Sequence, residues 1–310
     1  MTTFLEFRDL GLRDREILKP VFKRLQPEIS DRSFTNLFMW QDFYKIKLAR
    51  HRGNILLYAS STTTPEKEFF FPPLGSEGIS RTIQTCFDYL KDRGAIPIIR
   101  RASEQFVQDN HQALNDFQVE RDNDISDYIY RAEDLISLKG RRYHGQRNFI
   151  SRFKRSYHYS VEEIEPANIE ECMAFCDAWL ANKTDAFVQR GMTEQAFTFL
   201  RAETSATKKT LRYFEALELT GIAIRIDGRL VAITIGELLN RDTALIHVEK
   251  CNHTFLGLSQ FISQEFCRLY WSGCKFINRM EDLGIESLRK AKIALGPHHM
   301  AYKYNILPRP

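Results

Sequence analysis

The sequence lacks any long apolar run, which limits how it can relate to a membrane. No stretch of about 18 apolar residues occurs among its 310 residues, and this excludes a membrane-spanning helix. The first nine residues already carry charged side chains, where a secretory signal needs an apolar segment. These absences predict a cytoplasmic protein, and they leave a peripheral association with a membrane open.

Cysteine and glycine are too sparsely placed for the common metal and nucleotide sites. The chain has six cysteines and 15 glycines. Cys172 and Cys176 lie four residues apart, but no second pair matches them, so we expect buried thiols and no metal site. The turn before the helix expected at Gly257 has no glycine-rich phosphate loop, which weakens the case for coenzyme A. We predict no resident cofactor.

The net charge of +4 is unevenly distributed. The segment from Lys139 to His158 has seven basic side chains and no acidic one, and the segment from Ser160 to Asp177 has six acidic side chains and no Lys or Arg. The basic run can bind phosphate groups, but a solvated helix face paired with acidic neighbours explains it equally well. Arginine forks suit phosphates, and aromatic rings can stack on bases. The resulting candidates for binding tRNA or phosphate are Arg141, Arg142, Tyr143, His144, Arg147 and Asn148.

The expected secondary structure follows the same order twice, although no residue-level repeat accompanies it. Both halves read strand, strand, strand, helix, strand, helix, strand, from Asp42 to about Tyr130 and from Thr220 to Ile306. The strongest local signal is the hairpin dipeptide Asp227-Gly228. This order of elements is typical of the GNAT acyltransferase fold.

We therefore predict an α+β protein of two tandem GNAT-like domains. Each domain has a mixed, mostly antiparallel sheet flanked by helices. The predicted domains are residues 1–138 and residues 139–310. The second includes the basic linker helix, and we expect it to carry the active site.

One expected strand, Thr243–Lys250, carries ionisable side chains within an apolar segment. His247 and Glu249 lie two residues apart, so strand alternation places both on one face. Because such a pair is costly to bury without partners, it is either a general base for acyl transfer or a hydrogen-bonded core pair. His247 and Glu249 are catalytic candidates, and Lys250 and Gly257 are substrate-binding candidates.

The densest group of polar residues lies in Asn278–Lys292, where a strand is expected to end and a helix to begin. Glu281 and Asp282 follow the strand directly, at the edge where a GNAT fold has its reaction centre, and they are catalytic candidates. Arg289 and Lys292 lie three apart, hence on one helix face, where they can bind a carboxylate, a phosphate or an aminoacyl group. A solvated surface helix would have a similar sequence. Asn278, Arg289 and Lys292 are further substrate-binding candidates.

Four stretches of the chain carry a family resemblance: Asp31–Trp40, Gly140–Asn148, Ile246–Lys250 and Asn278–Lys292. At these residues the chain resembles the family named after the C-terminal domain of phosphatidylglycerol lysyltransferase, above all its stand-alone bacterial members. It is more distantly similar to the Fem-type aminoacyltransferases. The resemblance implies a tandem GNAT fold and transfer of an amino acid from aminoacyl-tRNA to an amine or hydroxyl.

The leading hypothesis is an aminoacyl-tRNA-dependent aminoacyltransferase whose partners are tRNA and a lipid or peptide acceptor. It requires the candidate groups between residues 249 and 292 to meet around one hollow of the second domain. One alternative is an N-acyltransferase that uses acyl-CoA. Another is a catalytically inactive GNAT-fold binding protein, in which alanine at Glu281 and Asp282 would reduce only ligand affinity.

Overall fold

The fold consists of mostly antiparallel strands with helices packed on their faces. The computed structural model describes residues 5–60, 67–189 and 193–309, so residues 1–4 of the charged N-terminal stretch lie outside the described residues. The chain forms two compact units. The first comprises Met1–Asp127, Glu281–Ile285 and Met300–Pro310, and the second comprises Tyr128–Met280 and Glu286–His299.

In the first unit the strands follow the order β1-β2-β3-β4-β5-β12-β6. The pairs β1–β2, β2–β3, β3–β4 and β5–β12 are antiparallel, and β4 and β5 are parallel. The strands are β1 (Arg8–Asp9), β2 (Lys47–His51), β3 (Asn54–Ser60), β4 (Glu68–Phe70), β5 (Ile99–Ser103), the first part of β6 (Phe117–Arg131) and most of β12 (His299–Pro308). The helices are η1 (Leu12–Asp14), α1 (Arg15–Leu25), η2 (Ser30–Arg32), α2 (Phe34–Met39), α3 (Gln41–Tyr44), α4 (Ile79–Asp92) and α5 (Glu104–Asp109).

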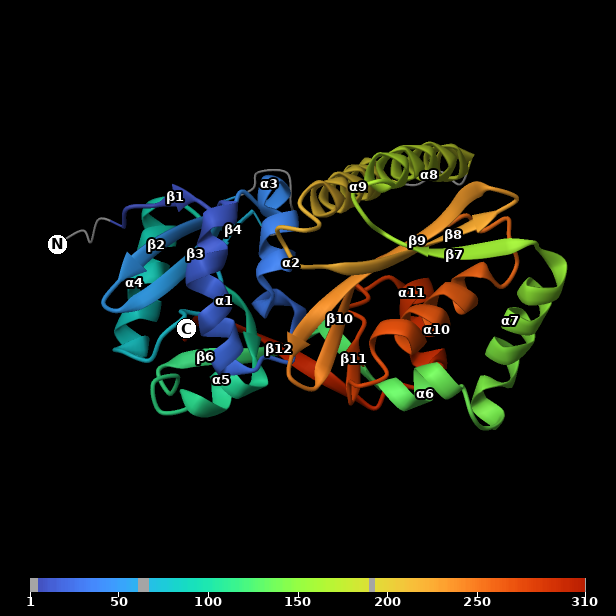
Figure 1. Ribbon diagram of the computed structural model, residues 1–310. Helices are drawn as coiled ribbons and strands as arrows, with labels where there is room; N and C mark the ends of the chain where they lie inside the picture. Colours follow the sequence, from blue (N-terminus) through green and yellow to red (C-terminus); the bar gives the residue numbers. More distant parts are fainter. Residues whose placement is uncertain (1–4, 61–66, 190–192, 310) are drawn as a thin grey trace. The chain divides into compact units, whose positions relative to one another are not determined.

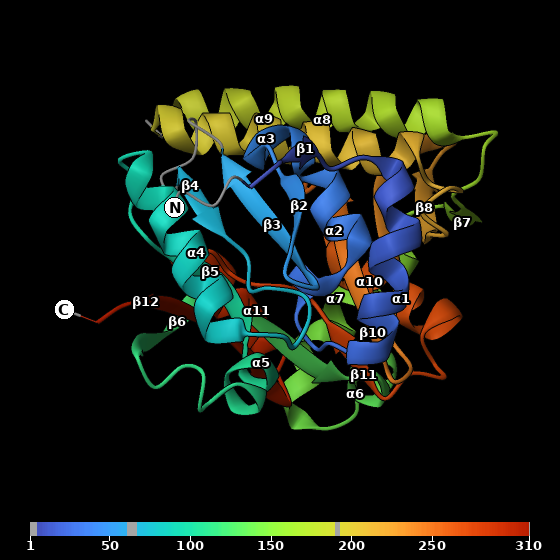
Figure 2. The same ribbon diagram turned by 90° about the vertical axis from the view of Figure 1, so that its left-hand side faces the viewer.

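Helix α4 covers one face of these strands because its apolar residues recur at helical spacing. Ile79, Ile83, Phe87 and Leu90 are buried in one cluster with residues of β3, β4 and β5. Burial of each such side chain contributes about 1.5–3 kcal/mol. Figure 2 shows α4 on one side of β2 and β3, with α1 and α2 on the other.

In the second unit the order is β6-β11-β10-β9-β8-β7. The pairings are antiparallel except between β10 and β11. The strands are the end of β6, β7 (Tyr159–Glu163), β8 (Thr220–Ile226), β9 (Arg229–Asn240), β10 (Thr243–Cys251) and β11 (Phe276–Asn278). The helices are α6 (Ala132–Ser137), η3 (Arg141–Tyr143), α7 (His144–Ser156), α8 (Ile169–Gln189), α9 (Glu194–Arg212), α10 (Leu258–Tyr270) and α11 (Glu286–Ala294).

Helices cover both faces of the second unit's sheet. Figure 1 shows α8 and α9 on one face of β7–β9, and α7 and α10 on the other. The hairpin between β8 and β9 turns at Asp227 and Gly228, whose φ angles of +49° and +78° match the expected turn. None of the described helices is long and apolar enough to cross a membrane.

Each unit contains one strand that comes from the other half of the sequence. Strand β6 closes the first series of elements, but its last residues pair with β11 in the second unit, where Tyr130 lies opposite Ile277. Strand β12 closes the second series, but it pairs with β5 in the first unit, where Lys303 lies opposite Ser103. The boundary expected at residues 138 and 139 stays a prediction.

The element order expected from the sequence is present in both halves. The first series was expected to open with a strand from Asp42, but residues 41–44 form α3, and β2 begins only at Lys47. The left-handed Lys45, with φ of +51°, separates these two elements. After α4, strand β5 begins only at Ile99, because Gly94, with φ of +70°, starts a longer turn.

Candidate active site

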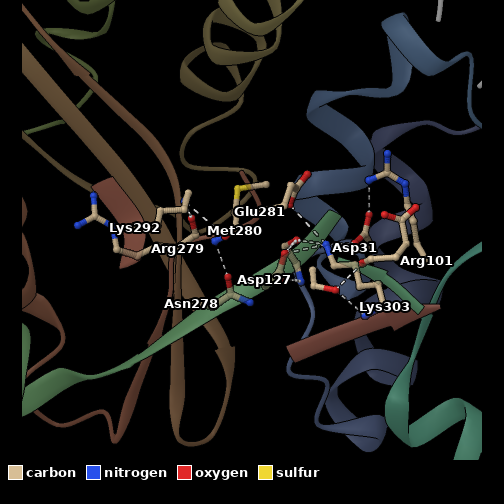
Figure 3. A network of polar contacts seen from close by, with 12 residues as sticks. Asp31, Arg101, Asp127, Asn278, Arg279, Met280, Glu281, Lys292 and Lys303 are labelled. Atoms are coloured by element: carbon tan, nitrogen blue, oxygen red, sulfur yellow. Dashed lines mark hydrogen bonds and ion pairs between the residues drawn. The ribbon is translucent and has the colours of Figure 1, made fainter. Parts of the chain in front are cut away.

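The first unit contains a buried cluster of charged side chains around Lys303 of β12 (Figure 3). The Lys303 side chain is 0% exposed. Its Nζ lies 2.5 Å from Asp31 Oδ2, 2.7 Å from Asp127 Oδ1 and 3.4 Å from Glu281 Oε2. It also donates a hydrogen bond of 3.2 Å to Ser30 Oγ. Residues from η2, β6, β12 and the turn after β11 therefore meet at one ammonium group.

Two arginines flank the cluster. Arg101 of β5 donates from Nη1 to Asp31 Oδ1 at 2.9 Å and from Nη2 to the Tyr44 hydroxyl at 3.3 Å. Arg101 also has φ of +66°, a conformation that costs free energy in a non-glycine residue and is common at functional sites. Arg32 is buried beside Asp31 and donates to the Pro72 carbonyl at 3.3 Å. Burial lowers the pKa of Arg32 to about 10, although Asp31 opposes this shift.

The cluster shifts the pKa values of its members in opposite directions. Burial alone would raise the pKa of Asp31, but Lys303 and Arg101 outweigh it and hold that pKa at about 2. Burial would lower the pKa of Lys303, but the carboxylates of Asp127, Asp31 and Glu281 raise it well above its usual value. For Glu281, burial dominates and raises the pKa, although Lys303 acts against it. Divergent values within one cluster are typical of acid–base sites.

The other catalytic candidate beside Glu281 has a different environment. Asp282 is fully buried, and its Oδ1 accepts a hydrogen bond of 2.8 Å from the Gly284 backbone N–H. Gly284 has φ of +71°, and a Cβ there would lie 3.1 Å from Asp124 Oδ2. Asp282 therefore helps to hold the turn between β11 and α11, which requires a glycine.

In the second unit, Glu249 of β10 pairs with Arg279, which follows β11. Their Oε2 and Nη2 atoms lie 2.8 Å apart. Arg279 also donates to Ser263 Oγ of α10 at 2.6 Å, and Ser259 Oγ donates to the second oxygen of Glu249 at 3.4 Å. Burial would lower the pKa of Arg279, but Glu249 raises it. This pair therefore joins two strands and one helix.

Asn278 and Lys292 hold the backbone that follows β11 (Figure 3). Asn278 Oδ1 accepts a hydrogen bond of 2.7 Å from the Met280 N–H, which supports the left-handed Met280 with φ of +59°. Lys292 Nζ of α11 donates to the carbonyls of Arg279 and Met280. Arg289 is half-buried on the same helix.

His247 and Glu249 do not share one environment, because a register shift between Ile246 and Val248 interrupts the alternation of β10. His247 Nε2 lies 2.9 Å from Glu237 Oε1 of β9. The two candidates therefore have different partners, and the expectation that they lie on one regular strand face was wrong.

Lys250 is anchored by the helices over its sheet face. Its Nζ lies 2.8 Å from Glu203 Oε1 of α9 and 3.7 Å from the centre of the Trp179 ring of α8. The Trp179 indole donates to the Cys251 carbonyl at 3.1 Å. These contacts attach α8 and α9 to β10.

Gly257 precedes α10 and has φ of +88°. A Cβ at this position would lie 2.2 Å from the Phe149 carbonyl oxygen of α7. Glycine is required here for two reasons, the left-handed conformation and the close approach of the α7 backbone.

The basic run divides into inward and outward side chains. Arg147 donates to the carbonyls of Leu138 and Gly140, and the buried Tyr143 donates to the Leu295 carbonyl at 3.0 Å. These two residues support the fold around η3 and α7. The exposed members of the run are Lys139, Arg141, Arg142, His144, Asn148, Arg152, Lys154 and Arg155.

The structure thus distributes the candidates over separate groups. Glu281 and Asp282 belong to the first unit, whereas the other catalytic and substrate-binding candidates belong to the second. The expectation that the groups between residues 249 and 292 share one hollow of the second domain does not match this grouping. Their individual roles stay predictions.

The cluster around Lys303 was missed because its members are far apart in the sequence. The one available signal was a charged residue within an apolar strand, as for Asp127 between Ile125 and Tyr130, and for Lys303 between Ala301 and Ile306. Such a residue requires a buried partner.

The described residues contain no group of three or more His, Cys, Asp or Glu side chains that could hold a metal ion. Cys172 and Cys176 are buried thiols of α8. Burial raises the pKa of each to about 12.

Comparison with known proteins gives one family match. The model of the family described as "Phosphatidylglycerol lysyltransferase, C-terminal" matches residues 22–307. Among curated protein sequences, none matches the chain.

Solved structures show the same fold over nearly the whole chain. A conserved protein of unknown function from Bacteroides thetaiotaomicron is 28% identical with a TM-score of 0.84, covering 99% of this chain and 100% of its own. The structure of L-PGS from Bacillus licheniformis is 15% identical with a TM-score of 0.58, covering 95% and 92%. A tandem GNAT protein from the clavulanic acid biosynthesis pathway is 11% identical with a TM-score of 0.50, covering 97% and 98%. The predicted α+β fold with tandem GNAT architecture is confirmed.

Proposed function

Because the chain belongs to the family of phosphatidylglycerol lysyltransferase C-terminal domains, we propose that it is an aminoacyltransferase that uses aminoacyl-tRNA. It transfers the amino acid to an amine or hydroxyl group of a lipid or peptide. The match over residues 22–307 carries this proposal, since it includes residues of both compact units.

The geometry supports acid–base chemistry in the first unit. Transfer to an amine requires a group that takes up a proton as the new bond forms. Glu281 is a carboxylate with a raised pKa that retains slight exposure, 11% of its side chain, in an otherwise buried charged cluster. Asp31, by contrast, is 4% exposed and bound by two cations, Lys303 and Arg101.

The acyl-CoA alternative has weaker support. In a GNAT fold the pyrophosphate of coenzyme A binds at the backbone N–H groups of the turn before the helix that corresponds to α10. Here the backbone of α7 approaches that turn closely, since a Cβ at Gly257 would lie 2.2 Å from the Phe149 carbonyl oxygen. A carbonyl oxygen at this position disfavours a bound anion.

The direct test is a transfer assay. The protein is incubated with tRNA charged with one radiolabelled amino acid at a time, together with phosphatidylglycerol vesicles or with a mixture of peptide amines. We expect label to move from tRNA to one acceptor class, with acetyl-CoA having no effect. Absence of label transfer from every charged tRNA, or of tRNA binding at low salt, would reject the proposal.

The exposed part of the basic run leads to a prediction about salt. Arg152 and Arg155 are exposed, and neither forms an ion pair with a described residue. We expect Arg152→Gln with Arg155→Gln to weaken binding of charged tRNA. The magnitude of the slope of log K against log salt concentration should fall by about one to two. With fewer phosphate contacts, binding releases fewer counterions. Filter binding at several salt concentrations measures this slope.

The matched control removes a basic side chain elsewhere. Lys91 is exposed at the end of α4 in the first unit. Lys91→Gln should leave both the affinity and the slope unchanged. An equal loss in both variants would mean that tRNA binding does not depend on α7.

A further inference from the structure

Lys303 binds its three carboxylate neighbours unequally (Figure 3). A lysine ammonium has three N–H donors. The short contacts of 2.5 Å and 2.7 Å go to Asp31 and Asp127. The remaining donor is shared between Ser30 Oγ at 3.2 Å and Glu281 Oε2 at 3.4 Å. Glu281 is therefore the most weakly held carboxylate of the cluster.

The two closely held carboxylates have further partners that fix them. Asp31 accepts from Arg101 at 2.9 Å. Asp127 accepts from the Ser30 backbone N–H at 2.6 Å and from its hydroxyl at 3.1 Å. Glu281, by contrast, has an oxygen, Oε1, that accepts no hydrogen bond from the described residues. Of the three carboxylates, Glu281 is the one with an oxygen available to a reacting group.

The ion-pair partner of Glu281 is Lys303, which Asp31 and Asp127 bind more closely. The groups that act on Glu281 are the cations Lys303 and Arg101 and the anions Asp31 and Asp127. The two anions offset much of the attraction that the cations exert on Glu281, and burial raises the pKa of its carboxyl group. Its neighbour Asp282 is committed to the Gly284 N–H, and Arg279 on the preceding turn pairs with Glu249. A carboxylate in such an environment readily takes up a proton.

From this arrangement we infer that Glu281 is the proton acceptor of the transfer step, and that Lys303, Asp31 and Asp127 are its positioning residues. The inference rests on the proposed aminoacyl transfer. It assigns the first unit a catalytic part, with strand β12 from the end of the sequence carrying the lysine that holds the acceptor in place.

For an amine acceptor, the amine nitrogen attacks the ester carbonyl carbon of aminoacyl-tRNA, and a C–N bond forms. The nitrogen loses a proton to Glu281 Oε1, the ester C–O bond breaks, and Glu281 returns that proton to the departing ribose oxygen. A hydroxyl acceptor reacts in the same way with formation of a C–O bond. No oxidant, reductant or further reactant is required.

The test compares two nearly isosteric variants by single-turnover rate between pH 5 and pH 9. In the wild type the rate should rise with pH as Glu281 loses its proton. Glu281→Gln should lower the rate about 100-fold or more and remove this rise, because the amide cannot accept the proton. Asp127→Asn should retain the rise of the rate with pH but shift it to lower pH, since Asp127 raises the pKa of Glu281.

Two parallel measurements separate the failure of this inference from that of the proposed function. Binding of charged tRNA should be the same for wild type and Glu281→Gln. Carbon-13 NMR of labelled glutamate carboxyls, with Glu281→Gln to identify the signal, reports the titration of Glu281 without any activity. If no charged tRNA supports transfer, the proposed function is rejected. In that case the shift of the Glu281 carboxyl signal in Asp127→Asn decides whether the cluster sets the proton affinity of Glu281.

Two results would overturn the inference. One is a Glu281→Gln variant that keeps more than a tenth of the wild-type rate. The other is a Glu281 titration that Asp127→Asn does not move. Should Asp127→Asn fail to fold, Ser30→Ala replaces it, because loss of the hydroxyl leaves the third donor of Lys303 to Glu281 and should also lower the pKa.

Discussion

Replacing Lys303 by methionine is expected to lower the free energy of unfolding by about 3–5 kcal/mol, because it removes one partner from a buried ionic cluster. Lys303 is 0% exposed, and its ammonium contacts Asp31 and Asp127 at 2.5 Å and 2.7 Å. Methionine keeps the length of the side chain, so the loss reports the charge and not a cavity. Urea unfolding followed by circular dichroism measures it.

The pH dependence of this loss has a defined sign. Burial raises the folded-state pKa of Asp31, but Lys303 and Arg101 outweigh burial and lower this pKa to about 2. The stability that Asp31 contributes is therefore complete above its unfolded value of about 4 and disappears as the pH falls toward 2. Without Lys303 much of this contribution is absent at every pH, so the difference between wild type and variant should shrink below pH 4.

A lysine outside the cluster provides the control. The Lys290 side chain is 76% exposed and lies 3.4 Å from Glu286 on the same helix. Lys290→Met should change the stability by less than about 0.5 kcal/mol. If both methionine variants lost the same free energy, the buried cluster would have no special energetic weight.

Alanine at Gly257 should destabilise the protein by about 2–5 kcal/mol. The left-handed conformation costs a non-glycine residue about 1–2 kcal/mol, and overpacking adds about 1–3 kcal/mol. Both apply here, since φ is +88° and a Cβ would lie 2.2 Å from the Phe149 carbonyl oxygen. Thermal unfolding of Gly257→Ala measures the combined loss.

Gly145 is the matched control for this change. It lies in the first turn of α7, its φ is not in the left-handed region, and a Cβ built there meets no described heavy atom within 4 Å beyond its chain neighbours and the backbone of its own helix. Gly145→Ala should stabilise the protein by up to about 1 kcal/mol, because alanine loses less backbone freedom in a helix. Similar losses in both variants would contradict the role assigned to the contact between Gly257 and α7.

The order of elements could be predicted because each element carries a local signal. Helix α4 has apolar residues at helical spacing, and the β8–β9 hairpin turns at Asp227-Gly228. The repeated order of strands and helices was then sufficient to identify the fold. These signals depend on neighbouring residues alone.

The composition of the Lys303 cluster could not be predicted because it depends on strand exchange. Asp31 and Lys303 are separated by most of the chain, and they meet only because β12 pairs with β5 and not within its own half. A prediction that assigns each half its own strands places Lys303 in the second domain. The same assumption placed Glu281 beside Glu249.

The separate environments of His247 and Glu249 were missed for a local reason. Strand alternation holds only where the register is regular, and β10 has a shift between Ile246 and Val248. No residue in this segment signals the bulge, since it contains neither glycine nor proline. Partners of single side chains in a strand are therefore less predictable than the strand itself.

The crossed origin of the last strands also determines when the protein can finish folding during its synthesis. Ser103 of β5 pairs with Lys303, which the ribosome adds 200 residues later. At about 5–20 residues per second, the free edge of β5 is exposed for on the order of 10–40 seconds. An unpaired edge of this kind can join the edge of another chain. Nascent chains of this protein should therefore depend on chaperones until the final strand emerges.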